Sequence, residues 1–304
     1  MREKWMIARL TLAGAAKGMV HLVRTAPVHM RALVRRIPDN LELQLADLRA
    51  GDRFIAEQIY SGVFPLAGKL LYTEGRSPFE LKLPSYRFAR ELHSFNWLRH
   101  LDAPRSELNS SNARAHVMAW IVGDGLRAHK VASEDSVTAL RLMAFLQHSR
   151  LLLAGCDAPF YRALMRAILR DMTALRLRLG LVQDSARRIR MLTALCAARV
   201  ILPGHEAGLQ RALRALSTEL SGAVLPDGGH VSRNPEIMLD VLADIVPLKM
   251  LLVGESLAVP DGLAHAIDRM FAALRFFRHM DGEVALFNGV GAIVPRPDCH
   301  AAAP

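Results

Sequence analysis

The sequence predicts an all-α fold built from antiparallel helical hairpins. Apolar residues recur at helical spacing in several stretches, for example at Leu209, Leu213, Leu216 and Leu220. The predicted helices follow one another through connections of only a few residues, which makes neighbours antiparallel. The chain has 304 residues with 51% hydrophobic content, so it can bury a large core. Hairpins of this kind, laid side by side, build either a solenoid or a closed toroid.

Capping residues agree with the periodicity and set the helix ends. Asp157 can cap a helix that has Pro159 in its first turn, and Gly180 can end that helix. Pro203-Gly204 ends the next helix, and Pro247 is expected to kink or split a later one. The predicted helices, which make up a helical domain at 84–291, span 84–100, 106–128, 134–154, 158–179, 184–202, 206–222, 234–253 and 260–278.

Regions of other character flank the helical domain. Residues 1–38 are typical of a basic amphipathic helix, because Arg9, Lys17 and His21 interrupt the apolar run that a signal peptide or a membrane span would need. This helix either packs on the body of the protein or adheres to an anionic membrane surface. Residues 292–304 have no periodic pattern and are predicted to form a disordered tail.

Residues 39–83 are predicted to form a short helix and a β-hairpin arm. Phe64–Tyr72 alternates partly between apolar and polar residues, and Glu74-Gly75 supplies a turn. Phe79–Leu83 is then expected to return as the second strand. An extended arm in front of the helices is the alternative.

The chain is strongly basic. Its formal charge is +10 and its pI about 10.1. Guanidinium groups bind carboxylate, sulfate and phosphate through paired hydrogen bonds, so a polyanionic partner is one interpretation; solvated helix faces are the other. The sequence has no helix-turn-helix, zinc-finger or aromatic-stacking pattern, so nucleic acid is not an expected partner. Cys156, Cys196 and Cys299 show no metal-ligand spacing, so neither a disulfide framework nor a zinc site is indicated. No metal and no cofactor are expected.

Two loops of similar chemistry supply the candidate site. Both combine cationic, imidazole and amide side chains and lie at the ends of predicted helices. We expect them to converge on one anionic ligand. The candidates are His230, Arg233 and Asn234 in the first loop, and Arg278, His279 and Asn288 in the second.

Each candidate also has a structural interpretation. His230 stands before a helix and either serves as a base or donor, or bonds the local backbone. Asn234 precedes Pro235 and fits an N-cap, whereas Arg233 is better suited to bind an anion. The two cations of the second loop close a helix, where the helix dipole favours them without any function. Asn288 forms either a tight turn or a groove wall.

These loops and an earlier stretch resemble the bacterial heparinase II/III-like proteins. The earlier stretch is Arg53–Leu101, including Phe64-Pro65-Leu66-Ala67-Gly68-Lys69 and Leu92-His93-Ser94-Phe95-Asn96-Trp97. The likeness continues through Ala266–Phe277 and covers roughly residues 40–292. It implies that the hairpins close into an incomplete α/α toroid, the N-terminal region of a polysaccharide lyase without the β-sandwich that follows it in the family.

The resemblance implies β-elimination next to a uronic acid in an acidic polysaccharide such as a glycosaminoglycan. The uronate carboxylate must be neutralised, a base must remove the C5 proton, and an acid must protonate the leaving oxygen. The family acts on envelope or extracellular polymers, yet no clear signal peptide is present, so envelope and cytoplasm both stay open. His230 and Asn234 are then the catalytic candidates, and the substrate-binding candidates are Arg233, Arg278, His279 and Asn288.

Departures from the family predict weak or absent catalysis by this chain alone. A Tyr-His pair is expected two positions after the proline of the motif, and those positions hold Ile237 and Met238. Arginines occupy Arg187–Leu195, where the family has an asparagine. The β-sandwich does not follow, so a partner domain or chain is expected to supply it. The competing interpretation is a non-catalytic helical module that binds an anionic glycan or a membrane surface.

Overall fold

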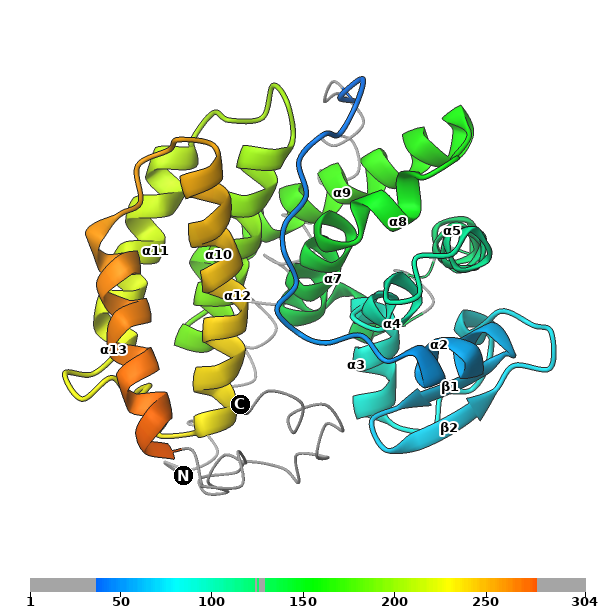
Figure 1. The fold of residues 1–304 in the computed structure, drawn as a ribbon, viewed down its shortest axis with the longest axis horizontal. Helices are drawn as coiled ribbons and strands as arrows, with labels where there is room; N and C mark the ends of the chain where they lie inside the picture. The colour runs from blue at the N-terminus through cyan, green and yellow to red at the C-terminus, as the bar shows by residue number, and fades with distance from the viewer. Residues whose placement is uncertain (1–36, 124, 126–128, 278–304) are drawn as a thin grey trace, which may run out of the picture.

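The computed structural model describes residues 37–123, 125 and 129–277, so most of the predicted N-terminal helix and the C-terminal tail lie outside it. The described residues form the predicted all-α fold with a two-stranded sheet (Figure 1). None of their helices is both long and apolar enough to span a bilayer. The longer helices are α3 (Tyr86–Ser94), α5 (Glu107–Val122), α7 (Asp135–Gln147), α9 (Ala158–Arg178), α10 (Ser185–Ile201), α11 (Leu209–Ala223), α12 (Pro235–Gly254) and α13 (Asp261–Phe277). The shorter ones are α2 (Arg53–Tyr60), α4 (Leu98–Asp102), α8 (Ser149–Leu153), and the 3₁₀ turns η1 (Pro78–Glu80), η2 (Lys130–Ser133) and η3 (Leu179–Leu181).

The long helices lie in two layers, and the chain alternates between them. In the first layer α3 contacts α7, α7 contacts α10, and α10 contacts α12. The second layer holds α5, α9, α11 and α13; α9, α11 and α13 pack against first-layer helices, and α5 packs against α9 (Figure 1). Helices α7 and α10 are buried on nearly every side, whereas α11 and α13 each bury one apolar stripe. A curved double layer of helical hairpins is the result.

The periodic leucines form the core between the layers. Leu213, Leu216 and Leu220 of α11 are at most 1% exposed, as their spacing predicts. Burying each of them contributes about 1.5–3 kcal/mol relative to leaving it in water. The helical periodicity of the sequence is therefore confirmed as core packing.

The hairpin of the arm differs from its prediction. Strands β1 (Val63–Leu66) and β2 (Lys69–Tyr72) pair antiparallel, and the turn lies at Ala67 and Gly68, which both have positive φ. The predicted second strand at Phe79–Leu83 is wrong. Phe79 belongs to η1, where its ring is buried and packs against the rings of His93 and Phe95. Because the ring of Phe79 is buried against these rings, its segment forms a 3₁₀ turn and does not pair as a strand.

Several predicted helices are also interrupted or shortened. The helix expected at 84–100 breaks at Phe95, whose φ of 59° is left-handed and whose ring is fully buried among other aromatic rings. The helix expected at 134–154 breaks at His148, between α7 and α8. Pro247 does not split α12, which runs from Pro235 to Gly254.

An extended segment, residues 37–52, crosses between the ends of the curved layer. We call it the crossing segment. Figure 1 shows it running between α10 and α12 on one side and α4 on the other. Leu45 is fully buried, and its backbone N–H donates to the Leu146 carbonyl at 3.3 Å. The Gln147 amide donates to the Ala46 carbonyl, and the Tyr161 hydroxyl donates to the Pro38 carbonyl. These bonds fix the segment against α7 and α9.

Candidate functional site

The first predicted loop lies between α11 and α12. His230 is 3% exposed and forms an isolated β-bridge with Val224. Its Nδ1 accepts from the Ser232 backbone N–H, and its Nε2 is buried without a hydrogen-bond partner in the described structure. Burial lowers the pKa of this imidazole, so it is neutral at physiological pH. A polymer cannot reach a ring buried in this way.

The neighbours of His230 have local partners. The Asn234 side-chain oxygen accepts from the backbone N–H groups of Glu236 and Ile237, at 2.8 and 3.2 Å, so the N-cap role is confirmed. Arg233 has a φ of 53°, and its Nη1 pairs with the carboxylate of Asp227. Both members of that pair are about half exposed, so solvent weakens it.

The second predicted loop lies outside the described residues. Arg278, His279 and Asn288 follow the end of α13 at Phe277, and the structure does not place them. Their convergence with the first loop stays a prediction.

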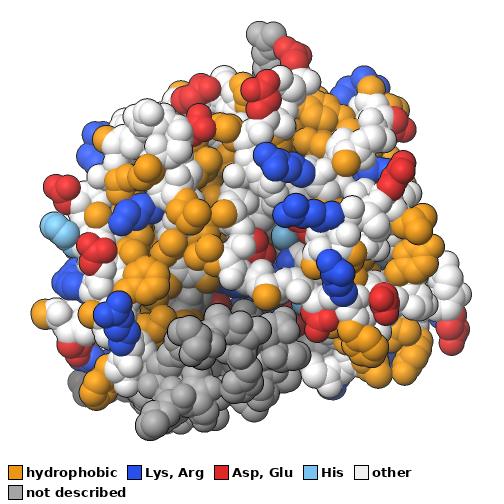
Figure 2. Space-filling model, viewed as in Figure 1, with side chains coloured by type: hydrophobic (Ala, Val, Ile, Leu, Met, Phe, Trp, Pro, Cys, Tyr) orange, Lys and Arg blue, Asp and Glu red, His pale blue; other side chains and the backbone are white. Residues whose placement is uncertain are grey.

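A cavity of about 630 Å³ opens between the crossing segment, α4, the start of α5 and α8. Figure 2 shows Lys and Arg side chains around a hollow on this face of the molecule. We call it the arginine cavity, because its lining includes Arg49, Arg99, Arg105 and Arg150. Arg105 and Arg150 are exposed, whereas Arg49 and Arg99 are largely buried. None of the sequence-predicted site residues that the structure describes lines it.

An ion cluster forms the floor of the arginine cavity. His148 Nδ1 lies 2.9 Å from a carboxylate oxygen of Asp102, and its Nε2 lies 3.6 Å from Asp47. Burial alone would lower the pKa of His148, but the two carboxylates outweigh burial and raise it. Burial would raise the pKa of Asp47, but His148, Arg99 and the Arg49 backbone N–H lower it to about 2. The two carboxylates therefore favour the protonated form of His148, and in that form the ring cannot accept a proton.

A second ion cluster joins the crossing segment to α10 and α12. Asp244 is 1% exposed and accepts from Arg49 at 2.8 Å and from Arg190 at 2.9 Å. Asp240 accepts from Arg190 at 3.0 Å and is half exposed. Burial alone would lower the pKa of Arg190, but the carboxylates of Asp244 and Asp240 outweigh burial and raise it. Arg190 belongs to the stretch Arg187–Leu195, where the resemblance places an asparagine in the family, so this position holds a structural ion pair here.

The tyrosines also lie away from the cavity. The Tyr86 hydroxyl donates to the Glu134 carboxylate, and the Tyr161 hydroxyl donates to the Pro38 carbonyl. Tyr60 and Tyr72 are exposed on the arm. All four tyrosines of the sequence are described, and none lines the arginine cavity. In the described ranges no three His, Cys, Asp or Glu side chains are grouped so that they could hold a metal ion.

Comparison with known proteins shows which folds and sequences this chain resembles. No family model matches the chain. The chain is 29% identical over 262 residues to FtsZ-localized protein C of Caulobacter vibrioides, a match that covers 85% of the chain and 44% of that protein. Among solved structures it is similar to heparan sulfate lyase HepC of Pedobacter heparinus, with a TM-score of 0.58, 14% identity, and coverage of 91% of the chain and 47% of that protein. It is also similar to a heparinase III, with a TM-score of 0.59, 14% identity, and coverage of 84% and 43%.

These likenesses show a fold resembling the helical toroid of heparinase III, as the sequence resemblance implies. The chain spans less than half the length of the proteins it matches. At 14% identity, the similarity to these solved structures shows the fold and does not show the function.

We predict that Asp244→Ala lowers the free energy of unfolding by about 3–5 kcal/mol, because it leaves Arg49 and Arg190 without their buried counter-ion. Asp240→Ala is the matched control on the same helix. Its carboxylate is half exposed, so the loss should stay below about 1 kcal/mol. Denaturant unfolding of both variants measures this, and equal losses would contradict the assignment.

We also predict a pH dependence of stability that comes from His148. Its raised pKa means that its stabilisation is complete below the ordinary value of about 6.5 and is lost as the pH rises through the folded pKa. The lowered pKa of Asp47 gives stabilisation that is complete above 3.8 and lost as the pH falls through about 2. Unfolding free energies measured between about pH 6 and 9 should therefore fall on the alkaline side.

His148→Gln should remove most of this alkaline slope. His116→Gln is the control, because burial lowers the pKa of His116 to about 4 and the ring is already neutral in that range. An unchanged slope in His148→Gln would contradict the ion cluster.

Proposed function

We propose that this chain is a non-catalytic binding module on a lyase-type toroid, and that it holds an acidic polysaccharide in the arginine cavity. The observation that carries the proposal is the cavity itself. It gathers four arginines, of which Arg105 and Arg150 are exposed, around the imidazole of His148, whose pKa the neighbouring carboxylates raise. Guanidinium groups pair with the carboxylates and sulfates of such a polymer. The fold of the heparan sulfate lyases supports this class of ligand.

The charge balance of the cavity supports anion binding. The carboxylates of Asp47 and Asp102 are paired with His148 and Arg99 and are not available to repel an anion. Arg49 is held by Asp244. The exposed guanidiniums of Arg105 and Arg150 then face the solvent at the rim, where a polyanion can reach them.

The same side chains argue against β-elimination by this chain. The reaction needs a base for the C5 proton and an acid for the leaving oxygen. His148 is fixed between two carboxylates, and His230 is buried beneath its loop. The sequence resemblance leads us to expect a phenol two positions after Pro235, where this chain has Ile237. The expected partner domain and a membrane contact of residues 1–38 stay predictions from the sequence.

The test is a binding titration with heparan sulfate together with a lyase assay that follows the absorbance of unsaturated product. We expect salt-dependent binding, no turnover, and roughly tenfold weaker binding in the double variant Arg105→Ala, Arg150→Ala. Arg214→Ala is the charge-matched control, an exposed arginine on α11 that does not line the cavity. Vigorous turnover, or equal weakening in the control, would overturn the proposal.

The loop site that the sequence predicts is tested in the same titration. Arg233→Ala removes the one guanidinium among the candidates that the structure describes. If this variant alone loses heparan sulfate, the ligand lies at the α11–α12 loop and the arginine cavity is the wrong assignment.

A second candidate function rests on the curated relative. The match to FtsZ-localized protein C runs over 85% of the chain at 29% identity, well above the identity of the lyase matches. We propose that this chain also localises with FtsZ. A fluorescent fusion expressed in Caulobacter vibrioides beside labelled FtsZ tests this. Bands that follow FtsZ through the cell cycle are expected, and a uniformly diffuse signal from a full-length fusion would contradict it.

A further inference from the structure

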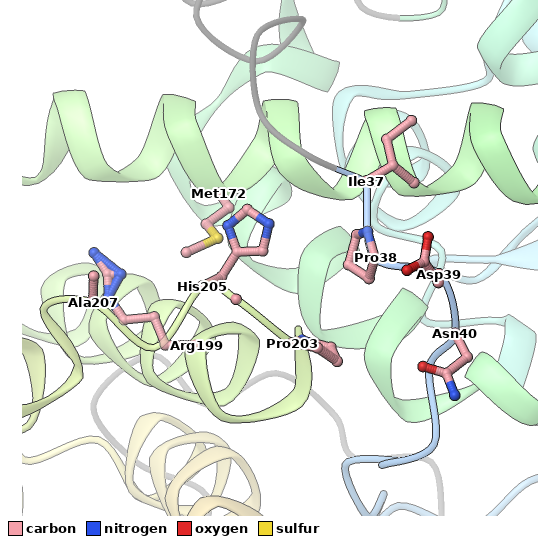
Figure 3. A pocket seen from close by; sticks show the side chains of 10 residues that line it. Ile37, Pro38, Asp39, Asn40, Met172, Arg199, Pro203, His205 and Ala207 are labelled. Carbon is pink, nitrogen blue, oxygen red and sulfur yellow. The ribbon is translucent and has the colours of Figure 1, made fainter.

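A second cavity, of about 510 Å³, lies at the start of the crossing segment. It shares no lining residue with the arginine cavity or with the α11–α12 loop. Figure 3 shows Arg199, His205 and Ala207 on one wall, at the end of α10 and in the connection to α11, and residues 37–40 opposite. Met172 of α9 and Pro203 add apolar surface.

Arg199 is the unusual group in this cavity. It is 8% exposed, and both Nε and Nη1 are buried without a hydrogen-bond partner in the described structure. Among the described residues its guanidinium forms no ion pair either. Burial lowers its pKa, and the charge of Arg176 lowers it further. Two buried guanidinium nitrogens without hydrogen-bond partners are unfavourable unless an anion meets them.

The surroundings of Arg199 add positive potential. Helix α11 begins at Leu209, and its N-cap Gly208 has a φ of 86° and no side chain to cap the first turn. A Cβ on Gly208 would lie 3.7 Å from Nη2 of Arg199, so the guanidinium packs against the positive end of the helix dipole. A guanidinium beside a helix N-terminus is the arrangement that proteins use to hold anions.

The nearby carboxylates do not neutralise Arg199. Asp39 lines the opposite wall of the cavity (Figure 3). Glu206 is exposed and accepts from the backbone N–H of Gly204 at 2.8 Å. Neither forms an ion pair with Arg199, so the positive wall faces the cavity without a counter-ion from the described chain.

We propose that this cavity binds the oxyanion group of a small molecule, a phosphate or a carboxylate, on Arg199 and the first turn of α11. The volume fits a small ligand, whose apolar part would lie against Met172 and Pro203. This site is independent of the glycan proposal and can exist whether or not the arginine cavity binds a polymer.

The test is thermal unfolding and calorimetry with inorganic phosphate and with glucuronate, each against chloride at constant ionic strength. We expect at least one of them to raise the unfolding temperature of the full chain by about 2 °C or more. Arg199→Met should weaken that binding at least about tenfold. In buffer without either anion it should unfold at or above the wild-type temperature, because it removes an unpaired buried charge.

Arg178→Met is the matched control. Arg178 has the same 8% exposure, but its guanidinium donates to the Ser133 carbonyl and pairs with Asp135. Its replacement should lower the unfolding temperature and leave anion binding unchanged.

A further variant keeps Arg199 and does not depend on the folding of Arg199→Met. Ala207→Asp places a carboxylate on an exposed wall residue beside the guanidinium, just before α11. It should weaken phosphate or glucuronate binding at least about tenfold and raise the unfolding temperature. The proposal is overturned if neither anion binds the wild type at about 10 mM, or if binding survives unchanged in these two variants.

Discussion

A carboxylate buried between two guanidiniums links three segments of this fold that lie far apart in the sequence. Asp244 of α12 receives Arg190 from α10 and Arg49 from the crossing segment, and it is almost completely buried. Removing one member of such a group leaves a charge without water or partner, which is far costlier than losing an ordinary contact. Two residues before Arg49, Asp47 joins the same segment to His148 and Arg99. Ion pairs therefore attach the crossing segment to α12 on one side and to α4 and His148 on the other.

The same ion pairs are the basis of the proposal that the arginine cavity binds and does not catalyse. A general base must be free to take a proton, and two carboxylates contact the imidazole of His148 and favour its protonated form. On this proposal, the exposed guanidiniums at the rim bind the anion. Function depends on the groups placed on a fold, so a shared fold does not require a shared activity. The likeness to an FtsZ-localized protein is compatible with a scaffold of this kind.

Local chemistry explains what the sequence predicts correctly. Periodic leucines predict the helices, and the N-cap of Asn234 follows from its position before Pro235. The second strand at Phe79–Leu83 is wrong because Phe79 is buried against rings that come later in the chain. The ion pair between Arg49 and Asp244 joins residues 195 positions apart, and no local pattern marks either one. The burial of His230 likewise depends on packing that the loop sequence does not display.

Hydrogen exchange across residues 37–52 tests the central claim most directly, because the claim is that ion pairs and backbone hydrogen bonds fix this segment within the toroid. The account predicts slow exchange at Leu45, whose N–H donates to Leu146, with protection approaching that of α7 and α10. Exchange of the whole segment at the rate of an unstructured peptide, while α7 and α10 remain protected, would contradict it.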